Sequence, residues 1–168
     1  ELPTAPFNVL AEEAIVFTRS VLEAEDRAQI RGFSDSIRWG DQALFCHGAP
    51  FDRDEYLVLR TQFEGIVAAQ DTRFVFCGHT HQQFVFDGHE LSSGPGDFEF
   101  GPDGRALVNP GSVGQPRDGD SRAAYAVLDD EVGHLSLRRI EYDIEEQIER
   151  VRRAGLPSSL GERLRVGH

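Results

Sequence analysis

Methionine, cysteine and long apolar runs are all scarce in this 168-residue sequence. It contains no Met and does not begin with one, so we expect its true N-terminus to lie upstream of Glu1. No run reaches the roughly 18 apolar residues that a membrane-spanning helix needs, and no basic region followed by an apolar stretch predicts a secretory signal. The two cysteines, Cys46 and Cys77, are too few for a disulfide scaffold. Each ends an apolar run, which predicts buried free thiols and a reducing, cytoplasmic location.

Positive charge is also in short supply. Lys and Arg together number 17 against 29 Asp and Glu, so the net charge at pH 7 is -12. Such a chain repels nucleic acid and anionic lipid at long range, which argues against a membrane or a long duplex as partner. A phosphate-ester substrate would need bound divalent cations to attract it. The hydrophobic fraction of 39% and the chain length are typical of a single globular domain.

Apolar residues recur at helical or strand spacing along most of the chain. Helices are predicted over Phe7–Leu22, Ala24–Ile30, Asp52–Gln70 and Ile144–Ala154, and strands over Ala43–Cys46, Arg73–Cys77, Gln83–Phe86, Ala106–Val108, Ala123–Leu128 and His134–Tyr142. Asn8 is expected to cap the first helix, and Phe17 and Phe63 are expected in the core. The stretch Leu91–Gly104 is rich in Gly and acidic residues, which predicts a surface loop or a loose hairpin. The order of elements predicts an α/β fold with sheets between helices.

Three of the predicted strands end in polar turns that contain glycine: His47-Gly48, Gly78–His81 and Asn109–Ser112. Ligands of open α/β sheets gather at the carboxyl ends of strands. The connection between Gly48 and the next strand is long enough for a right-handed crossover between parallel neighbours. In that arrangement His47 and His79 emerge at the same edge of the sheet.

The histidines of these turns are the candidate metal ligands. His79 and His81 follow Gly78, whose backbone can turn sharply, so the two imidazoles can enter one cavity at different heights. Neutral imidazole is a common ligand of zinc, iron and manganese, and the two ions of a dinuclear site lie about 3.5–4 Å apart. His47 is the natural third ligand. Turn residues without a ligand role are the alternative, and the spacing by itself leaves both interpretations open.

These motifs together resemble those of calcineurin-like metallophosphoesterases, in particular bacterial phosphodiesterase and diadenosine-polyphosphatase-like members. Gly78-His79-Thr80-His81 resembles the GHTH signature of that superfamily. Phe45–Gly48 resembles the strand and single His before it, and Leu107–Arg117 resembles the strand and loop after it. The likeness extends from about Phe7 to Pro157.

The resemblance implies two stacked mixed β-sheets flanked by helices, a four-layer α/β/β/α sandwich. It also implies a site for two divalent metals (Mn, Fe, Zn or Ni), with His47 and His79 on one ion and His81 on the other. In the family, a metal-bridging hydroxide attacks phosphorus in line while the ions neutralise the phosphoryl charge. The implied activity is hydrolysis of small phosphate mono- or diesters.

Other motifs of the family are absent from the sequence. Asp-x-His, Gly-Asp and Gly-Asn-His-Asp/Glu supply its bridging Asp, an Asn ligand and the His that assists the leaving group. Gly40-Asp41 and Gly88-His89-Glu90 look similar but stand in the wrong order, and the second is better explained as a turn. We therefore expect residues 1–168 to be the C-terminal part of a single metallophosphoesterase domain, with no assigned catalytic residue. Three imidazoles without a carboxylate should bind at most one metal, weakly, and should not catalyse.

The remaining polar residues near the motifs have structural interpretations. Asn109, Gly111 and Ser112 are expected to form a turn beside the site, and Thr80 to hold the GHTH turn with its hydroxyl. Arg117 is interpreted as an exposed loop residue. Two rival functions stay open: a non-catalytic binding or scaffold module of the same fold, and a structural zinc domain that uses Cys46 and Cys77 with His47 and His79.

Overall fold

The computed structural model describes residues 9–168, so the predicted cap at Asn8 lies outside the described residues. The chain divides into two compact units. One contains residues up to Phe33 together with Asp143–Arg165, and the other contains Ser34–Tyr142 with Val166–His168. Each unit is considered by itself. No helix among residues 9–168 is both long enough and apolar enough to cross a membrane.

The first unit is helical. Its elements are α1 (Val9–Val21), α2 (Ala24–Arg31), α4 (Ile144–Arg153), α5 (Ser158–Glu162) and the 3-10 turn η1 (Arg163–Arg165). The first three confirm the predicted helices over the described residues, whereas α5 and η1 were not predicted. No residue of α1 is buried, and Phe17 is only half-buried, so its placement in the core was wrong.

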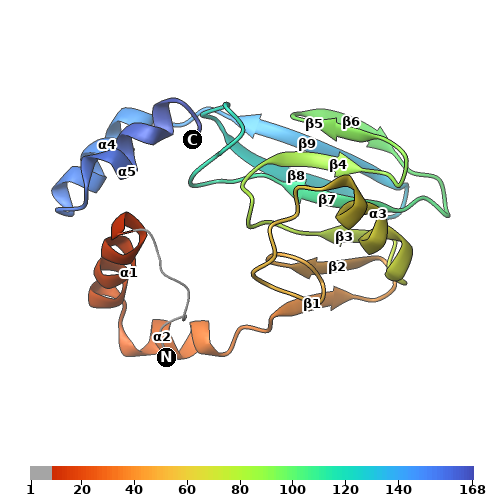
Figure 1. Ribbon diagram of the computed structural model, residues 1–168, viewed down its shortest axis with the longest axis horizontal. Helices are drawn as coiled ribbons and strands as arrows, with labels where there is room; N and C mark the ends of the chain where they lie inside the picture. The colour runs from red at the N-terminus through yellow and green to blue at the C-terminus, as the bar shows by residue number, and fades with distance from the viewer. Residues whose placement is uncertain (1–8) are drawn as a thin grey trace. The chain divides into compact units, whose positions relative to one another are not determined.

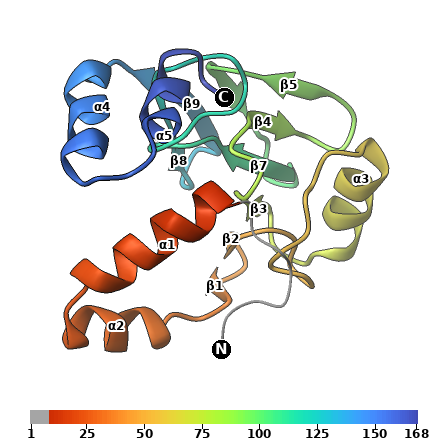
Figure 2. The ribbon, with the colours of Figure 1, turned by 60° about the vertical axis from the view of Figure 1, so that its left-hand side comes forward.

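Helix α4 shows clear capping and packing. The side chain of Asp143 accepts a hydrogen bond from the Glu146 backbone N–H (2.8 Å), which satisfies one of the free donors of the first turn. Ile148 is 1% exposed and packs against Gly161 of α5, where a Cβ would approach the Ile148 Cα to 3.2 Å. Glycine at 161 therefore allows α4 and α5 to lie side by side (Figure 2).

The second unit contains two stacked β-sheets (Figure 1). Six strands form a mixed sheet in the order β1-β2-β3-β7-β4-β5, and three form an antiparallel sheet in the order β6-β9-β8. Their bounds are β1 Ser36–Trp39, β2 Ala43–Cys46, β3 Phe74–Phe76, β4 Gln83–Phe86, β5 Leu91–Ser93, β6 Gly96–Glu99, β7 Ala106–Pro110, β8 Ala123–Asp129 and β9 His134–Ile140. Two stacked sheets with helices confirm the predicted fold class.

The central strands of the six-stranded sheet are covered on both faces, by different partners. On one face Phe63 and Ile66 of helix α3 (Arg60–Ala69) pack with Phe84 and Phe86. On the other face Phe74, Phe76, Val85 and Val108 meet Leu135 and Leu137 of the three-stranded sheet. This is why β4 is buried at all four positions. A strand that is buried on both faces needs apolar residues at successive positions, so the apolar runs of the sequence form the central strands of this sheet.

The strands that precede the predicted turns are adjacent and parallel. β2 pairs with β3, and β3 pairs with β7, both in parallel register. Their carboxyl ends, which lead into His47, Gly78 and Asn109, consequently lie at one edge of the sheet. This confirms the predicted pairing of the strands that end near Cys46 and Cys77.

Three regions differ from the sequence predictions. Helix α3 begins at Arg60 and not at Asp52. Residues 49–54 instead form a tight turn, in which the backbones of Ala49 and Asp52 pair and the Asp52 side chain accepts the Asp54 N–H (2.9 Å). β1 was not predicted. The expected loop over Leu91–Gly104 contains β5 and β6, which belong to different sheets.

Candidate metal centre

Two of the predicted ligands are in direct contact. His47 follows β2 and His79 follows β3, and Nδ1 of His79 lies 2.8 Å from Nε2 of His47. Their ring centroids are 4.6 Å apart with the planes at 68°. The Tyr56 ring also lies against His79, with centroids 4.0 Å apart. The parallel strands therefore bring two imidazoles of distant sequence together at one edge of the sheet.

The backbone of His79 and His81 is held in an unfavourable conformation. Their φ angles are 63° and 60°, and among residues 9–168 they are the only non-glycine residues with positive φ. Left-handed backbone costs a residue with a Cβ about 1 kcal/mol or more, and such positions cluster at functional sites. Gly78 precedes the first of these two strained histidines, and Thr80 lies between them. The strained backbone of the turn therefore lowers the stability of the fold, and it sets the direction of these two side chains.

Hydrogen bonds from three segments hold this turn. The Gly78 N–H donates to the His47 carbonyl and the Thr80 N–H donates to the Gly78 carbonyl, each at 2.7 Å. Asn109 is fully buried, and its Nδ2 donates to the Gly78 carbonyl and to Thr80 Oγ1, both at 3.0 Å. Its Oδ1 accepts the Gly111 N–H at 2.9 Å. Asn109 thus holds the GHTH turn by hydrogen bonds. The Thr80 hydroxyl accepts one of these bonds, in agreement with its predicted role in holding the turn.

His81 is anchored separately from the other two histidines. Its Nδ1 lies 2.7 Å from the Gln115 carbonyl, an interaction in which Nδ1 donates and Nε2 is left with its lone pair. Ser112 Oγ accepts the Gln115 N–H (2.8 Å), which fixes the loop that supplies this carbonyl. A carbonyl on the second ring nitrogen is the usual means of orienting a metal-binding histidine. His81 is therefore prepared to bind through Nε2.

Arg117 is closer to the histidines than its interpretation as an exposed loop residue predicted. It is partly buried, and its backbone N–H donates to the His81 carbonyl (3.1 Å). Its charge contributes to lowering the pKa of both His79 and His81. The loop after β7 therefore contributes a cation to this edge of the sheet.

The electrostatics of the site favour neutral imidazole. Burial is the largest cause that lowers the pKa of His79, followed by the neighbouring His47. Burial also lowers the pKa of His81, against the opposing effect of its bond to Gln115. Because only the neutral ring offers a lone pair to a metal, both shifts favour the ligand form.

The histidine donors fit a divalent ion, but they do not complete a site. Two nitrogens about 2.1 Å from one ion, at angles of about 90–110°, are separated by about 3.0–3.4 Å. The 2.8 Å between His47 and His79 is only slightly shorter than this spacing. Within residues 9–168, however, no three His, Cys, Asp or Glu side chains are grouped so that they could hold one ion.

The cysteines are poorly suited to bind zinc. The Cys46 thiol contacts the Gly48 carbonyl (3.4 Å), and the Cys77 thiol contacts the Val108 carbonyl (3.5 Å). Burial raises the pKa of Cys46 to about 11 and raises that of Cys77 further above its usual range. Because zinc binds the thiolate, these environments disfavour the four-ligand zinc site. Both thiols are free, as predicted, although Cys46 is only half-buried.

The look-alike motifs are turns. Gly40, at φ 51°, joins β1 and β2. Gly88, at φ 94°, turns the chain between β4 and β5. There the Asp87 side chain accepts the N–H groups of His89 (2.8 Å) and Glu90 (2.7 Å). These local roles account for both motifs.

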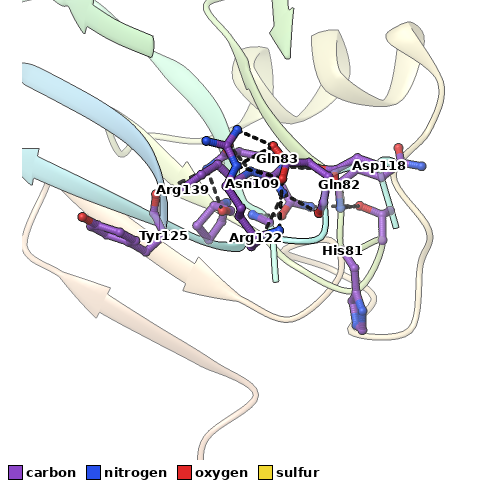
Figure 3. Close-up of polar contacts among 12 residues, drawn as sticks. His81, Gln82, Gln83, Asn109, Asp118, Arg122, Tyr125 and Arg139 are labelled. Carbon is purple, nitrogen blue, oxygen red and sulfur yellow. Dashed lines mark hydrogen bonds and ion pairs between the residues drawn. The ribbon is translucent and has the colours of Figure 1, made fainter. Parts of the chain in front are cut away.

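A polar network beside His81 was missed by the sequence analysis (Figure 3). The Arg139 side chain is 2% exposed and pairs with Asp118. Its Nε donates to Gln83 Oε1 at 2.9 Å, while the Gln83 N–H donates to Asp118 Oδ2 at 2.9 Å. Gln83 and Arg139 are 56 positions apart, and no local pattern signals their contact. In Figure 3 the His81 ring points away from this network.

The chain is similar to known proteins over nearly its whole length. The model of the calcineurin-like phosphoesterase superfamily domain matches residues 15–132. An uncharacterized protein of Methanocaldococcus jannaschii, MJ0912, is 31% identical over 166 residues, covering 96% of this chain and 68% of the relative.

Two solved structures share the fold. A metallophosphoesterase from Sphaerobacter thermophilus has a TM-score of 0.85 at 30% identity, covering 98% of this chain and 72% of that one. The hypothetical protein PH1004 from Pyrococcus horikoshii OT3 has a TM-score of 0.78 at 17% identity, covering 98% and 63%. With the family model matching more than half of its residues, this chain belongs to the calcineurin-like phosphoesterase superfamily.

Proposed function

We propose that the protein hydrolyses phosphate mono- or diesters at a dinuclear centre of divalent metals. His47 and His79 hold one ion and His81 holds the other. The observation that carries the proposal is the turn with two strained histidines, which Asn109 holds and which brings His79 into contact with His47. Membership of a phosphoesterase superfamily supplies the reaction class.

The residues of this chain position and tune the site. Asn109 and the Gly78–His47 backbone bond keep the GHTH turn in register with β2, and Gln115 keeps Nε2 of His81 available. When bound, the metals would polarise the phosphoryl group, activate water and provide the positive charge that a chain of net charge -12 lacks. Arg117 adds a fixed positive charge near His79 and His81 that could contact a phosphoryl oxygen.

The rest of the metal ligands are proposed to come from outside residues 1–168. The chain spans 68% of the length of MJ0912 and 72% of the Sphaerobacter thermophilus metallophosphoesterase. On this proposal residues 1–168 are the C-terminal part of one metallophosphoesterase domain, and a carboxylate that bridges two ions lies elsewhere in the protein. The free thiols favour a reducing compartment such as the cytoplasm.

One observation favours a second candidate for residues 1–168 alone. Within residues 9–168, no group of three acidic, His or Cys side chains is placed to hold an ion. By themselves these residues would then act as a non-catalytic module of the same fold. The two proposals make different predictions for the complete gene product. In the first it supplies the missing metal ligands and hydrolyses phosphate esters, and in the second it does neither.

The test is hydrolysis of bis-p-nitrophenyl phosphate with added Mn²⁺. We expect the complete gene product to release p-nitrophenol, and we expect His79→Ala and His81→Ala to reduce kcat/KM by at least about 100-fold. The 168-residue chain should be inactive. A complete gene product that does not hydrolyse this or related esters, with any of Mn²⁺, Zn²⁺, Fe²⁺ or Ni²⁺, would support the non-catalytic module.

A further inference from the structure

The loop of residues 111–122, which joins β7 to β8, supplies the carbonyl that orients His81. The Gln115 carbonyl lies 2.7 Å from His81 Nδ1, and the Arg117 N–H donates to the His81 carbonyl at 3.1 Å. Groups that hold the second ring nitrogen of a metal-binding histidine matter for affinity, and changes to them typically cost about 10–100-fold. The position of this loop therefore controls how His81 presents Nε2 to an ion.

Residues 111–122 contain no helix or strand, so individual contacts hold this loop in place. Near its start, the Ser112 carbonyl accepts the Ala124 N–H at 2.9 Å. Further along, the Asp118 side chain accepts the Gln83 N–H at 2.9 Å and pairs with Arg139 of β9. Asp118 directly follows the residue whose N–H donates to the His81 carbonyl. Its carboxylate therefore holds the part of the loop that contacts His81.

Arg139 binds this loop at several points. Its side chain is 2% exposed, and that of its partner Asp118 is 19% exposed. Its Nε donates to Gln83 Oε1 (2.9 Å), and its Nη1 donates to the backbone carbonyls of Asp120 (3.2 Å) and Arg122 (3.3 Å). Three of these acceptors belong to the loop, and the fourth begins β4 (Figure 3). Because Arg139 lies on β9, one guanidinium joins the loop to both sheets.

Stability by itself is a weak explanation for this ion pair. Taking two charges out of water is costly, and apolar residues of similar volume are often as stabilising or more so. A guanidinium has a different advantage, because its five N–H donors lie in a fixed plane and can hold several acceptors at set positions. In Figure 3 the His81 ring points away from Arg139, so any effect on the ring passes through the loop and not through direct contact.

We propose that Arg139 and Asp118 are positioning residues for His81. Their buried pair places the loop so that the Gln115 carbonyl holds the His81 proton on Nδ1 and leaves Nε2 for a metal ion. Neither residue of the pair touches the ion or the substrate. The inference rests on the proposed function, because His81 acts as a ligand only where the site holds an ion.

The experiment determines the tautomer of His81 in the complete gene product without metal. Nitrogen NMR chemical shifts of the ring are measured at about pH 8, where a neutral imidazole is expected, and a His81→Gln variant identifies the signals. The wild type should carry the proton on Nδ1. Arg139→Gln should shift the ring towards the Nε2–H tautomer, because the carbonyl that accepts from Nδ1 is no longer held. The ring signals of His89 should stay unchanged, since it lies in the β4–β5 turn.

Arg138→Gln is the matched control. Arg138 is the preceding residue of β9, but its guanidinium pairs with Asp97 of β6 and is 40% exposed. The variant removes the same charge from the same strand and should leave the His81 tautomer as in the wild type. Equal shifts in the two variants, or no shift with Arg139→Gln, would overturn the proposal.

Asp118→Asn tests the pair from its other side, and it decides the matter if Arg139→Gln does not fold. It keeps a side-chain oxygen for the Gln83 N–H and removes the charge that pairs with Arg139. We expect a smaller shift of the His81 tautomer in the same direction. A tautomer that is identical to that of the wild type would overturn the proposal.

Mn²⁺ titration of the same proteins gives a second readout. We expect Arg139→Gln to weaken Mn²⁺ binding by about tenfold and Arg138→Gln to leave it unchanged. The tautomer is measured without metal, so its shift in Arg139→Gln would support the positioning role even if the complete gene product hydrolysed no ester. An unchanged tautomer in a variant of the active enzyme would overturn the positioning role alone.

Discussion

The second unit contains two clusters built around histidine, and the pKa values of their histidines shift in opposite directions. His47, His79 and His81, which we call the histidine rim, lie near Arg117 and near one another. His134 on β9 lies between two carboxylates instead, with Nδ1 2.5 Å from Glu99 and Nε2 3.2 Å from Asp97. The pKa values of His79 and His81 are lowered, and that of His134 is raised by its bond to Glu99.

The difference separates a ligand environment from a structural one. On the rim, the backbone is strained at His79 and His81, and the bond of His81 Nδ1 to the Gln115 carbonyl leaves the Nε2 lone pair of that ring for another partner. Around His134, the ring nitrogens are occupied by Glu99, Asp97 and Ser136, and the protonated form links β6 to β9. Histidine content is therefore a poor guide to a metal site, whereas the partner of each ring nitrogen is a good one.

Removing a rim histidine should have the largest effect. We expect His79→Ala to weaken Mn²⁺ binding to the complete gene product by more than about 100-fold, because changes at groups that merely orient ligands already cost about 10–100-fold. His134→Ala is the matched control and should not change the affinity. Titration calorimetry measures both. If the two variants bind Mn²⁺ alike, the distinction between the clusters fails.

Removing the buried polar support of each cluster should have a smaller effect. Asn109→Ala removes one hydrogen bond each from the Gly78 carbonyl and the Thr80 hydroxyl, and it leaves the Gly111 N–H without the Asn109 Oδ1 acceptor. We expect a loss of about 2–4 kcal/mol in the free energy of unfolding and a Mn²⁺ affinity that is about 10–100-fold lower.

Ser136→Ala is the corresponding change beside His134. Ser136 is 7% exposed and donates to Asp97 (2.7 Å), a carboxylate that can turn to water. We expect a loss of about 1 kcal/mol and unchanged metal affinity. Urea unfolding measures the stability of both variants, and titration calorimetry measures their Mn²⁺ affinity. A Ser136→Ala variant that lost Mn²⁺ binding would contradict the separation of the His134 cluster from the metal site.

The edge of the sheet was predictable because its signals are local. Apolar runs followed directly by His-Gly, Gly-His or Asn-Pro-Gly mark both a central strand and its end, and β2, β3 and β7 followed from them. The contact of His47 with His79 then follows from parallel pairing. The positive φ angles of His79 and His81 were not predictable from local sequence, since Asn109 holds this turn by bonds across 29 and 31 positions.

The failures have two physical causes. Helical spacing of Tyr56 and Leu59 suggested a longer α3, but both residues are at least half exposed, because the chain around Asp52 closes a turn against Gly48. A Cβ at Gly48 would lie 2.6 Å from the Arg53 carbonyl, so that turn needs glycine. The other cause is distance along the chain. Gln83 and Arg139 are 56 positions apart, so no local sequence pattern could predict their network.

The smallest expected effect is the pH dependence of the His134 cluster. Because the pKa of His134 is raised in the folded protein, its ion pairs stabilise the fold fully below the ordinary value of 6.5 and are lost as pH rises through the raised pKa. The pKa of Asp97 is lowered to about 2, first by its bond to Arg138, so this carboxylate stays charged across that range. His134→Gln should therefore destabilise the protein more at about pH 5.5 than at about pH 8.5.

Urea midpoints of the wild type and His134→Gln at the two pH values measure this difference. His89→Gln, which alters an exposed histidine in the β4–β5 turn, is the control and should shift neither midpoint appreciably. A His134→Gln deficit of the same size at both pH values would mean that the neutral ring supplies the whole interaction. In that case Glu99 and Asp97 would hold His134 by hydrogen bonds alone, and the electrostatic contrast with the rim would not extend to stability.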